Sequence, residues 1–199
     1  MDNYAKMLRD AKLRFLTYDR QVLLQNPGVT PWEQGVKTTF LGSQIFCDCR
    51  TGDITRSDGK ECDFSQTLSV LDYICDRKTF ANASNVFCPV GSLPGVFVGG
   101  SGLSMGFEAL AEAVQREPDA FRKACLSLGA EEIPLGDMGY SVHIFPDLCM
   151  QIKFYFADEE FRPQLVFLWD RHILQFVRYE TVYYIAGCIA RELTARMGK

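Results

Sequence analysis

The chain has 199 residues, of which 47% are hydrophobic and 23% charged, fractions that exclude intrinsic disorder and low-complexity fibrous classes. A chain of this length can bury one sizeable core, so we expect a single globular domain over residues 1–199. The balance of 21 basic and 25 acidic residues gives a net charge of −4, which argues against a nucleic-acid partner because phosphate binding needs a basic surface.

The first predicted element is a long N-terminal helix, which we expect to end at Pro27-Gly28. It is predicted by apolar residues at alternating steps of four and three, which lie on one face of a helix: Tyr4, Leu8, Ala11, Phe15, Tyr18 and Val22. Such an apolar stripe either packs against its own domain or pairs with another chain, and we favour packing against its own domain.

Two short β-prone runs follow, and Gly42-Ser43 is the dipeptide of a two-residue turn between them. Folding there pairs Phe40 with Ile45. The alternation of a strand then places Cys47 and Cys49 on the core face with this pair.

Three helical patterns come next in the chain. The first begins after Ser65, a suitable N-cap, and buries Leu68, Leu71, Ile74 and Cys75. The second buries Phe107, Leu110, Ala111 and Val114. The third starts at Pro118 and ends at Gly129, the residue expected just beyond a helix C-terminus.

The last third returns to strands. Residues 140–145 and 149–156 alternate, and a three-residue loop between them pairs Tyr140 with Phe154 and sets His143 opposite Gln151. A further strand covers 165–169, and a final helix starts near Thr181. The fold class predicted from these elements is α+β: a mainly antiparallel sheet of about five strands packed with helices, with long N- and C-terminal helices.

A glycine-rich stretch is the first candidate site, with Gly99, Gly100, Gly102 and Gly106 preceding a helix. Glycines let the backbone approach a phosphate, and a helix N-terminus attracts anions. The spacing differs from a dinucleotide fingerprint, and a second helix rather than a strand follows the first. We interpret the stretch as a structural loop, with an anion or nucleotide site as the alternative.

Acidic and polar side chains form the second candidate site. Asp158, Glu159 and Glu160 lie at a bend between strands, where solvated carboxylates are common, and Asp170 is expected about 20 Å away as the cap of a short helical turn. His143 shares a polar sheet face with Ser141, as a possible base and nucleophile, but no carboxylate is fixed beside it.

The cysteines predict no metal site. Cys47-x-Cys49 is the only close pair in the sequence, and no second pair follows at zinc spacing. The eight cysteines are expected to be reduced and mostly buried. The start of the chain does not resemble a secretory signal, and the longest apolar stretch is about half a membrane span, so we expect a cytoplasmic protein with no membrane contact.

Several segments resemble a bacterial and archaeal family of unknown function. They are Gly136-Asp137, the run from Ala157 to Pro163, Phe167-x-x-Asp170 and Tyr179-Glu180-Thr181. The family pattern has Gly-Asp-Glu-Glu-Phe-Pro after a strand; here Ala157 replaces the glycine and Arg162 precedes the proline.

The resemblance implies a context of anaerobic metabolism, because the family is known mainly from anaerobes and some members carry an N-terminal iron–sulfur cluster domain. It implies no activity, catalytic residues or cofactor. The leading hypothesis is therefore a non-catalytic binding or accessory module that acts with a protein partner in redox or one-carbon metabolism. The alternative is a small-ligand binder or enzyme that uses the glycine-rich loop 99–106.

Overall fold

The computed structural model describes residues 3–96 and 107–198, and within them it confirms the predicted α+β class with helices near both ends. The helices are α1 Asn3–Leu16, α2 Arg20–Leu23, α3 Phe64–Cys75, α4 Glu108–Arg116, α5 Pro118–Ser127 and α6 Tyr179–Met197, with 3-10 turns at Val90–Ser92 and Ile173–Gln175. The strands are β1 Thr30–Trp32, β2 Gly35–Phe40, β3 Ser43–Cys47, β4 Ile54–Arg56, β5 Phe87–Cys88, β6 Glu131–Glu132, β7 Met138–Phe145, β8 Leu148–Tyr155 and β9 Gln164–Asp170.

These strands form two antiparallel sheets, one of four strands in the order β1-β2-β3-β4 and one of five in the order β5-β9-β8-β7-β6. The sheets meet where the backbone N–H of Leu41 donates to the carbonyl of Ile144 at 3.0 Å. The rings of Phe40 and Phe145 lie 5.2 Å apart at the same junction. Buried residues of both sheets therefore belong to one hydrophobic cluster.

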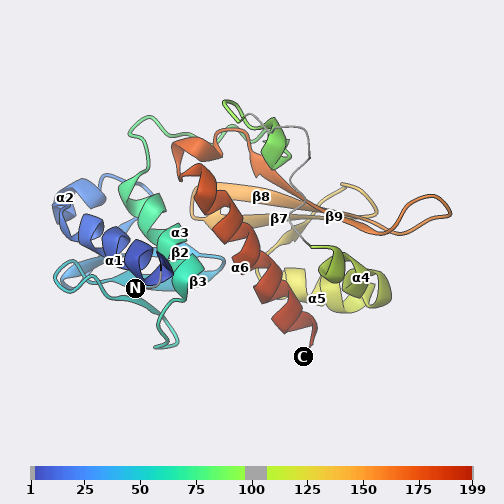
Figure 1. Cartoon of the computed structure of the whole chain (residues 1–199), viewed down its shortest axis with the longest axis horizontal. Helices are drawn as coiled ribbons and strands as arrows, with labels where there is room; N and C mark the ends of the chain where they lie inside the picture. The colour runs from blue at the N-terminus through green and yellow to red at the C-terminus, as the bar shows by residue number, and fades with distance from the viewer. Residues whose placement is uncertain (1–2, 97–106, 199) are drawn as a thin grey trace.

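Helices cover one face of this arrangement. Figure 1 shows α6 running diagonally across the molecule, with α1 and α3 over the four-stranded sheet and α4 and α5 near the C-terminal end of α6. The ring of Phe121 in α5 packs edge-on against Tyr140 of β7, and Tyr73 of α3 stacks on Phe145 at 3.8 Å. The apolar face of the larger sheet is thus buried under helices.

The predicted N-terminal helix is present but shorter than expected, because α1 ends at Leu16 instead of continuing to Pro27. Asp19 adopts an extended backbone conformation and its carboxylate accepts a hydrogen bond from the N–H of Gln21, which starts the short helix α2. Ala11 and Phe15 of the predicted stripe are buried, while Tyr4 and Val22 are exposed.

Both predicted hairpin registers are wrong by two residues. In the first hairpin Thr38 pairs with Ile45 and Phe40 with Ser43, so the turn is Leu41-Gly42. Both turn residues have positive φ, 47° and 75°, as a type I′ turn requires. Leu41 tolerates this strained conformation because its side chain is buried in the core.

In the second hairpin Tyr140 pairs with Ile152 and the turn is Pro146-Asp147. A two-residue turn would set apolar side chains against polar ones, but an irregularity between His143 and Phe145 inserts one extra residue and restores the match. The slip of two residues keeps every side chain on its predicted face. It also places His143 opposite Cys149 rather than Gln151.

Helix starts show smaller differences. Asp63, not Ser65, caps α3 and forms a reciprocal capping box with Gln66. The final helix begins at Tyr179 rather than Thr181. Pro118 in the first turn of α5 and Gly129 just beyond its end, at φ 81°, are confirmed.

Candidate ligand-binding groove

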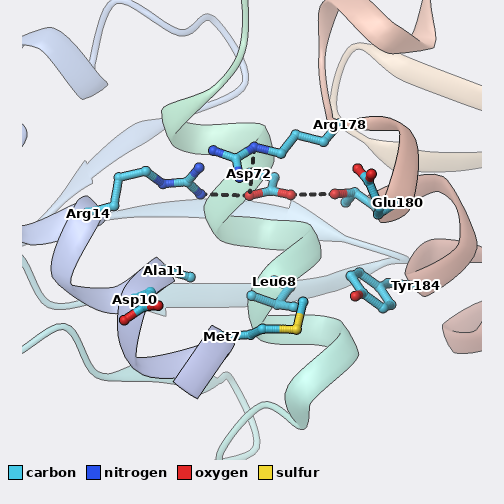
Figure 2. A pocket seen from close by; sticks show the side chains of 10 residues that line it. Met7, Asp10, Ala11, Arg14, Leu68, Asp72, Arg178, Glu180 and Tyr184 are labelled. Atoms are coloured by element: carbon cyan, nitrogen blue, oxygen red, sulfur yellow. Dashed lines mark hydrogen bonds and ion pairs between the residues drawn. The ribbon is translucent and has the colours of Figure 1, made fainter. Parts of the chain in front are cut away.

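A groove of about 510 Å³ lies between α1, α3 and the start of α6, within the size range of small-molecule sites. Figure 2 shows charged side chains across its upper end, and Met7 and Leu68 with the carboxylate of Asp10 at its lower end. Its lining comes from three elements far apart in the sequence: Met7, Asp10, Ala11 and Arg14; Leu68 and Asp72; and Arg178, Glu180, Thr181 and Tyr184.

Asp72 is the buried acid at the upper end, with 8% of its side chain exposed. Arg14 donates to one oxygen of its carboxylate at 2.6 Å, and the hydroxyl of Thr181 donates to the other oxygen (Figure 2). Each carboxylate oxygen thus has a partner on a different helix. The bonds tie α1 and α6 to α3.

Asp76 lies one helical turn after Asp72 and takes part in the same network. Arg14 donates to both of its oxygens, at 2.9 and 2.7 Å, and Arg178 approaches it at 2.6 Å. Burial lowers the pKa of Arg14, but its bonds to Asp72 and Asp76 outweigh burial and raise the pKa. The two guanidinium groups and the two carboxylates therefore neutralise one another as ion pairs.

The local sequence explains why these groups meet. The capping box at Asp63 fixes the start of α3, and residues four apart then share a face, which aligns Leu68, Asp72 and Asp76. Arg178 is the N-cap residue of α6, so Glu180 and Thr181 lie in its first turn, where the Thr181 hydroxyl donates to Asp72 of α3.

Two carboxylates add negative charge to the groove. Asp10 and Glu180 line it and are exposed, and neither has an ion pair among the described residues. Tyr184 lies one turn after Glu180; burial and then the charge of Glu180 raise the pKa of its hydroxyl. With the Arg14 and Arg178 charges balanced by Asp72 and Asp76, the groove carries a surplus of negative charge beside an aromatic ring.

The predicted acidic site lies outside the groove, and its Asp158 carboxylate accepts backbone hydrogen bonds. Asp158, Glu159 and Glu160 are exposed in the β8–β9 connection. The Asp158 carboxylate accepts from the N–H groups of Glu160 and Phe161 at 2.8 and 2.7 Å, and these bonds lower its pKa. Asp158 is thus held as the cap of a turn.

His143 is not brought to these acids. It lies opposite Cys149, and the end of β8 is six residues further on, about 20 Å at ~3.3 Å per residue. The glycines Gly99, Gly100, Gly102 and Gly106 lie outside the described residues. The candidate sites from the sequence therefore do not converge in the described part of the chain.

Asp170 sits at the end of β9 with 1% of its surface exposed. Its carboxylate accepts from the N–H of His172 at 2.8 Å, as expected for the cap of the following turn. It also accepts from the N–H and hydroxyl of Ser84 and the N–H of Asn85, at 3.1, 2.9 and 2.7 Å. These further bonds clamp the segment before β5 onto the larger sheet.

The groove residues were missed by sequence reasoning, which identified one apolar stripe of this helix, Leu68, Leu71, Ile74 and Cys75, and assigned no role to Asp72. The signal was present in the residues around it, because Val70, Leu71, Tyr73 and Ile74 are apolar on more than one face of α3. An acid within such a helix requires a cationic partner. The partner, Arg14, is 58 residues away in the sequence.

The described residues contain no cluster of three His, Cys, Asp or Glu side chains that could hold a metal ion. All eight cysteines are free; Cys47, Cys75, Cys125 and Cys188 are buried as predicted, while Cys49 is half-buried beyond β3. None of the helices in the described part of the chain is long and apolar enough to cross a membrane.

A family model matches residues 18–192, a range that includes the α3 and α6 walls of the groove but not the α1 wall. Comparisons with the curated proteins and with the solved structures found no match. Because the matched range covers well over half of the chain, the protein belongs to the family described as domain of unknown function DUF3786.

Proposed function

We propose that this chain is a non-catalytic binding module whose ligand site is the groove between α1, α3 and α6. The observation that carries the proposal is the composition of the groove: charged partners satisfied at one end, an apolar surface of Met7 and Leu68 at the other, and two carboxylates without ion pairs in the described chain. A concave apolar surface with a few oriented polar groups is the usual form of a small-ligand site.

The ligand class follows from the charge. A carboxylate at Glu180 and the ring of Tyr184, one turn apart on α6, suit an ammonium or guanidinium group through an ion pair and a cation–π contact. Met7 and Leu68 suit an apolar body attached to that group. We therefore infer a small cationic ligand with an apolar portion, or a basic side chain presented by a partner protein.

The test is a titration followed by two-dimensional amide NMR with three probes of one shape: phenethylamine, phenethyl alcohol and phenylacetate. We expect the amine to shift the amides around Glu180 and Tyr184, with affinity decreasing from the amine to the alcohol to the acid. Glu180→Gln should weaken amine binding by about fivefold, the value of one partly solvated ion pair.

Glu159→Gln is the matched control, because Glu159 is an exposed carboxylate in the β8–β9 connection, outside the groove. It should leave amine binding unchanged. Equal affinity for all three probes, or shifts confined to other surfaces, would contradict the assignment of the groove.

The cellular setting is a further part of the proposal. We propose a cytoplasmic module that acts with a protein partner in redox or one-carbon metabolism of an anaerobe. The support is the resemblance to a family with iron–sulfur fusions and the eight free thiols, which suit a reducing compartment. Affinity purification from anaerobically grown cells tests it, since recovery of no redox or one-carbon enzyme would contradict the setting.

A further inference from the structure

A thiol and an imidazole meet on the face of the five-stranded sheet opposite the helices. The Sγ atom of Cys149 lies 3.3 Å from Nδ1 and 3.6 Å from Nε2 of His143, directly across the β7–β8 pair. His143 is exposed and Cys149 is half-buried, so a small molecule can reach both. Neither residue takes part in the groove described above.

A cavity adjoins this pair. It has a volume of about 250 Å³ and lies where the two sheets meet. His143 forms part of its wall, and most of the rest is apolar or glycine: Gly42, Leu128, Gly129, Ile144, Phe145 and Pro146. The imidazole therefore borders both the thiol and an open pocket large enough for a small reactant.

The surroundings hold Cys149 in its neutral form. Burial raises the pKa of the thiol, and the charges of Glu131, Asp170 and Asp147 raise it further, whereas a hydrogen bond from Ser141 lowers it. A thiol of this kind reacts only when a base removes its proton, because the thiolate is the nucleophile. His143 is the base in reach.

We propose that Cys149, with His143 as its proton acceptor, is a site of thiol–disulfide exchange with small, positively charged disulfides. Cys149 transfers its proton to His143 and its sulfur attacks one sulfur of the disulfide. A new S–S bond forms on Cys149, the old S–S bond breaks, and the leaving thiolate takes the proton from His143. Cys149 is oxidised and the departing half of the disulfide is reduced to a thiol.

Exchange is the reaction that this site supports best. It needs a thiol, a base that accepts the thiol proton, and access for the disulfide, all of which are present. Acyl transfer would also need oriented donors for an oxyanion. The preference for a cationic disulfide follows from Glu131, an exposed carboxylate that lies opposite Ser141 in the β6–β7 pair and whose charge acts on Sγ.

The experiment uses the full chain, reduced and freed of reductant under anaerobic conditions, with cystamine as the cationic disulfide. Peptide mass spectrometry gives the rate of mixed-disulfide formation at each cysteine. Cys62 and Cys88 are internal references, because they are also half-buried. We expect Cys149 to react at least about tenfold faster than either reference, and faster with cystamine than with the anionic dithiodiglycolate.

The variant His143→Gln should slow the reaction of Cys149 by at least about fivefold and reduce the rate advantage of Cys149 over Cys62 and Cys88 by the same factor. His172→Gln, the matched change at the other histidine, should alter neither. Equal rates in wild type and His143→Gln, a Cys149 no faster than Cys62 and Cys88, or a preference for dithiodiglycolate would overturn the proposal.

Discussion

Asp72 and Asp170 are both buried carboxylates, with 5% and 1% of their surface exposed, but different partners hold them. Asp72 is held by the guanidinium of Arg14 and one hydroxyl at the edge of an open groove. Asp170 accepts four hydrogen bonds from uncharged donors, three of them backbone N–H groups. Asp170 thus accepts hydrogen bonds from backbone N–H groups that lack a strand or turn partner. Asp72 instead holds charged side chains around a groove that a ligand can enter.

The largest effect is expected at Asp170. Asp170→Ala removes the acceptor of four bonds and leaves the N–H groups of Asn85 and His172 unsatisfied, so unfolding free energy in urea should fall by about 4 kcal/mol. Glu160→Ala, an exposed carboxylate, should change it by less than about 0.5 kcal/mol. A loss under about 1 kcal/mol for Asp170→Ala would show that water replaces the clamp.

Replacing Asp72 should lower the unfolding free energy slightly less than replacing Asp170. Unlike the loss at Asp170, part of this loss should be recovered by a second substitution, at Arg14. Asp72→Leu leaves Arg14 with only its bonds to Asp76, and we expect a loss of about 3 kcal/mol in urea unfolding. Adding Arg14→Met removes the surplus positive charge, leaves Asp76 paired with Arg178, and should recover at least about 1 kcal/mol. Losses that simply add in the double variant would mean that the Arg14–Asp72 pair is not coupled.

Removing one hydroxyl donor from each carboxylate should have a smaller effect on the unfolding free energy. Thr181→Val removes the donor to Asp72 without changing shape, and Ser84→Ala removes one donor to Asp170, so each should lower the unfolding free energy by about 1 kcal/mol. In the Asp72→Leu background, Thr181→Val should have almost no effect, since its acceptor is absent. A full loss in that background would assign Thr181 a role separate from Asp72.

These two sites also differ in how far the sequence reveals them. Asp170 was expected to cap a turn because its partner His172 is two residues away, and that part of its role is present. Its bonds to Ser84 and Asn85 join positions about 85 residues apart. The groove depends wholly on such distant contacts, since Asp72 and Thr181 are 109 positions apart in the sequence, so local pattern could not predict it.

The hairpins show the same division between local and distant information. Alternation predicted which side chains face the core, and Ile45, Tyr140 and Ile152 are all buried. The register of a hairpin depends on which residues form its turn. Both turns were misassigned because contacts with distant parts of the chain determine which residues form them. Leu41 accepts a positive φ because the core buries its side chain, and the extra residue at Ile144 lets its carbonyl bond Leu41.

The smallest effect is expected at Asp158, and it tests whether an exposed carboxylate stabilises its turn through backbone N–H bonds as Asp170 does. Backbone N–H bonds from Glu160 and Phe161 lower the pKa of Asp158 below its ordinary 3.8. A depressed folded-state pKa contributes stability that is present above the unfolded value and is lost as pH falls through the folded one. The melting temperature of Asp158→Asn should therefore lie slightly below wild type at pH 7, and the difference should shrink as the pH falls below the ordinary pKa of 3.8. A difference in melting temperature that stays constant as the pH falls would mean that the charge of Asp158 does not stabilise the turn. The asparagine amide would then disturb the turn by its shape alone.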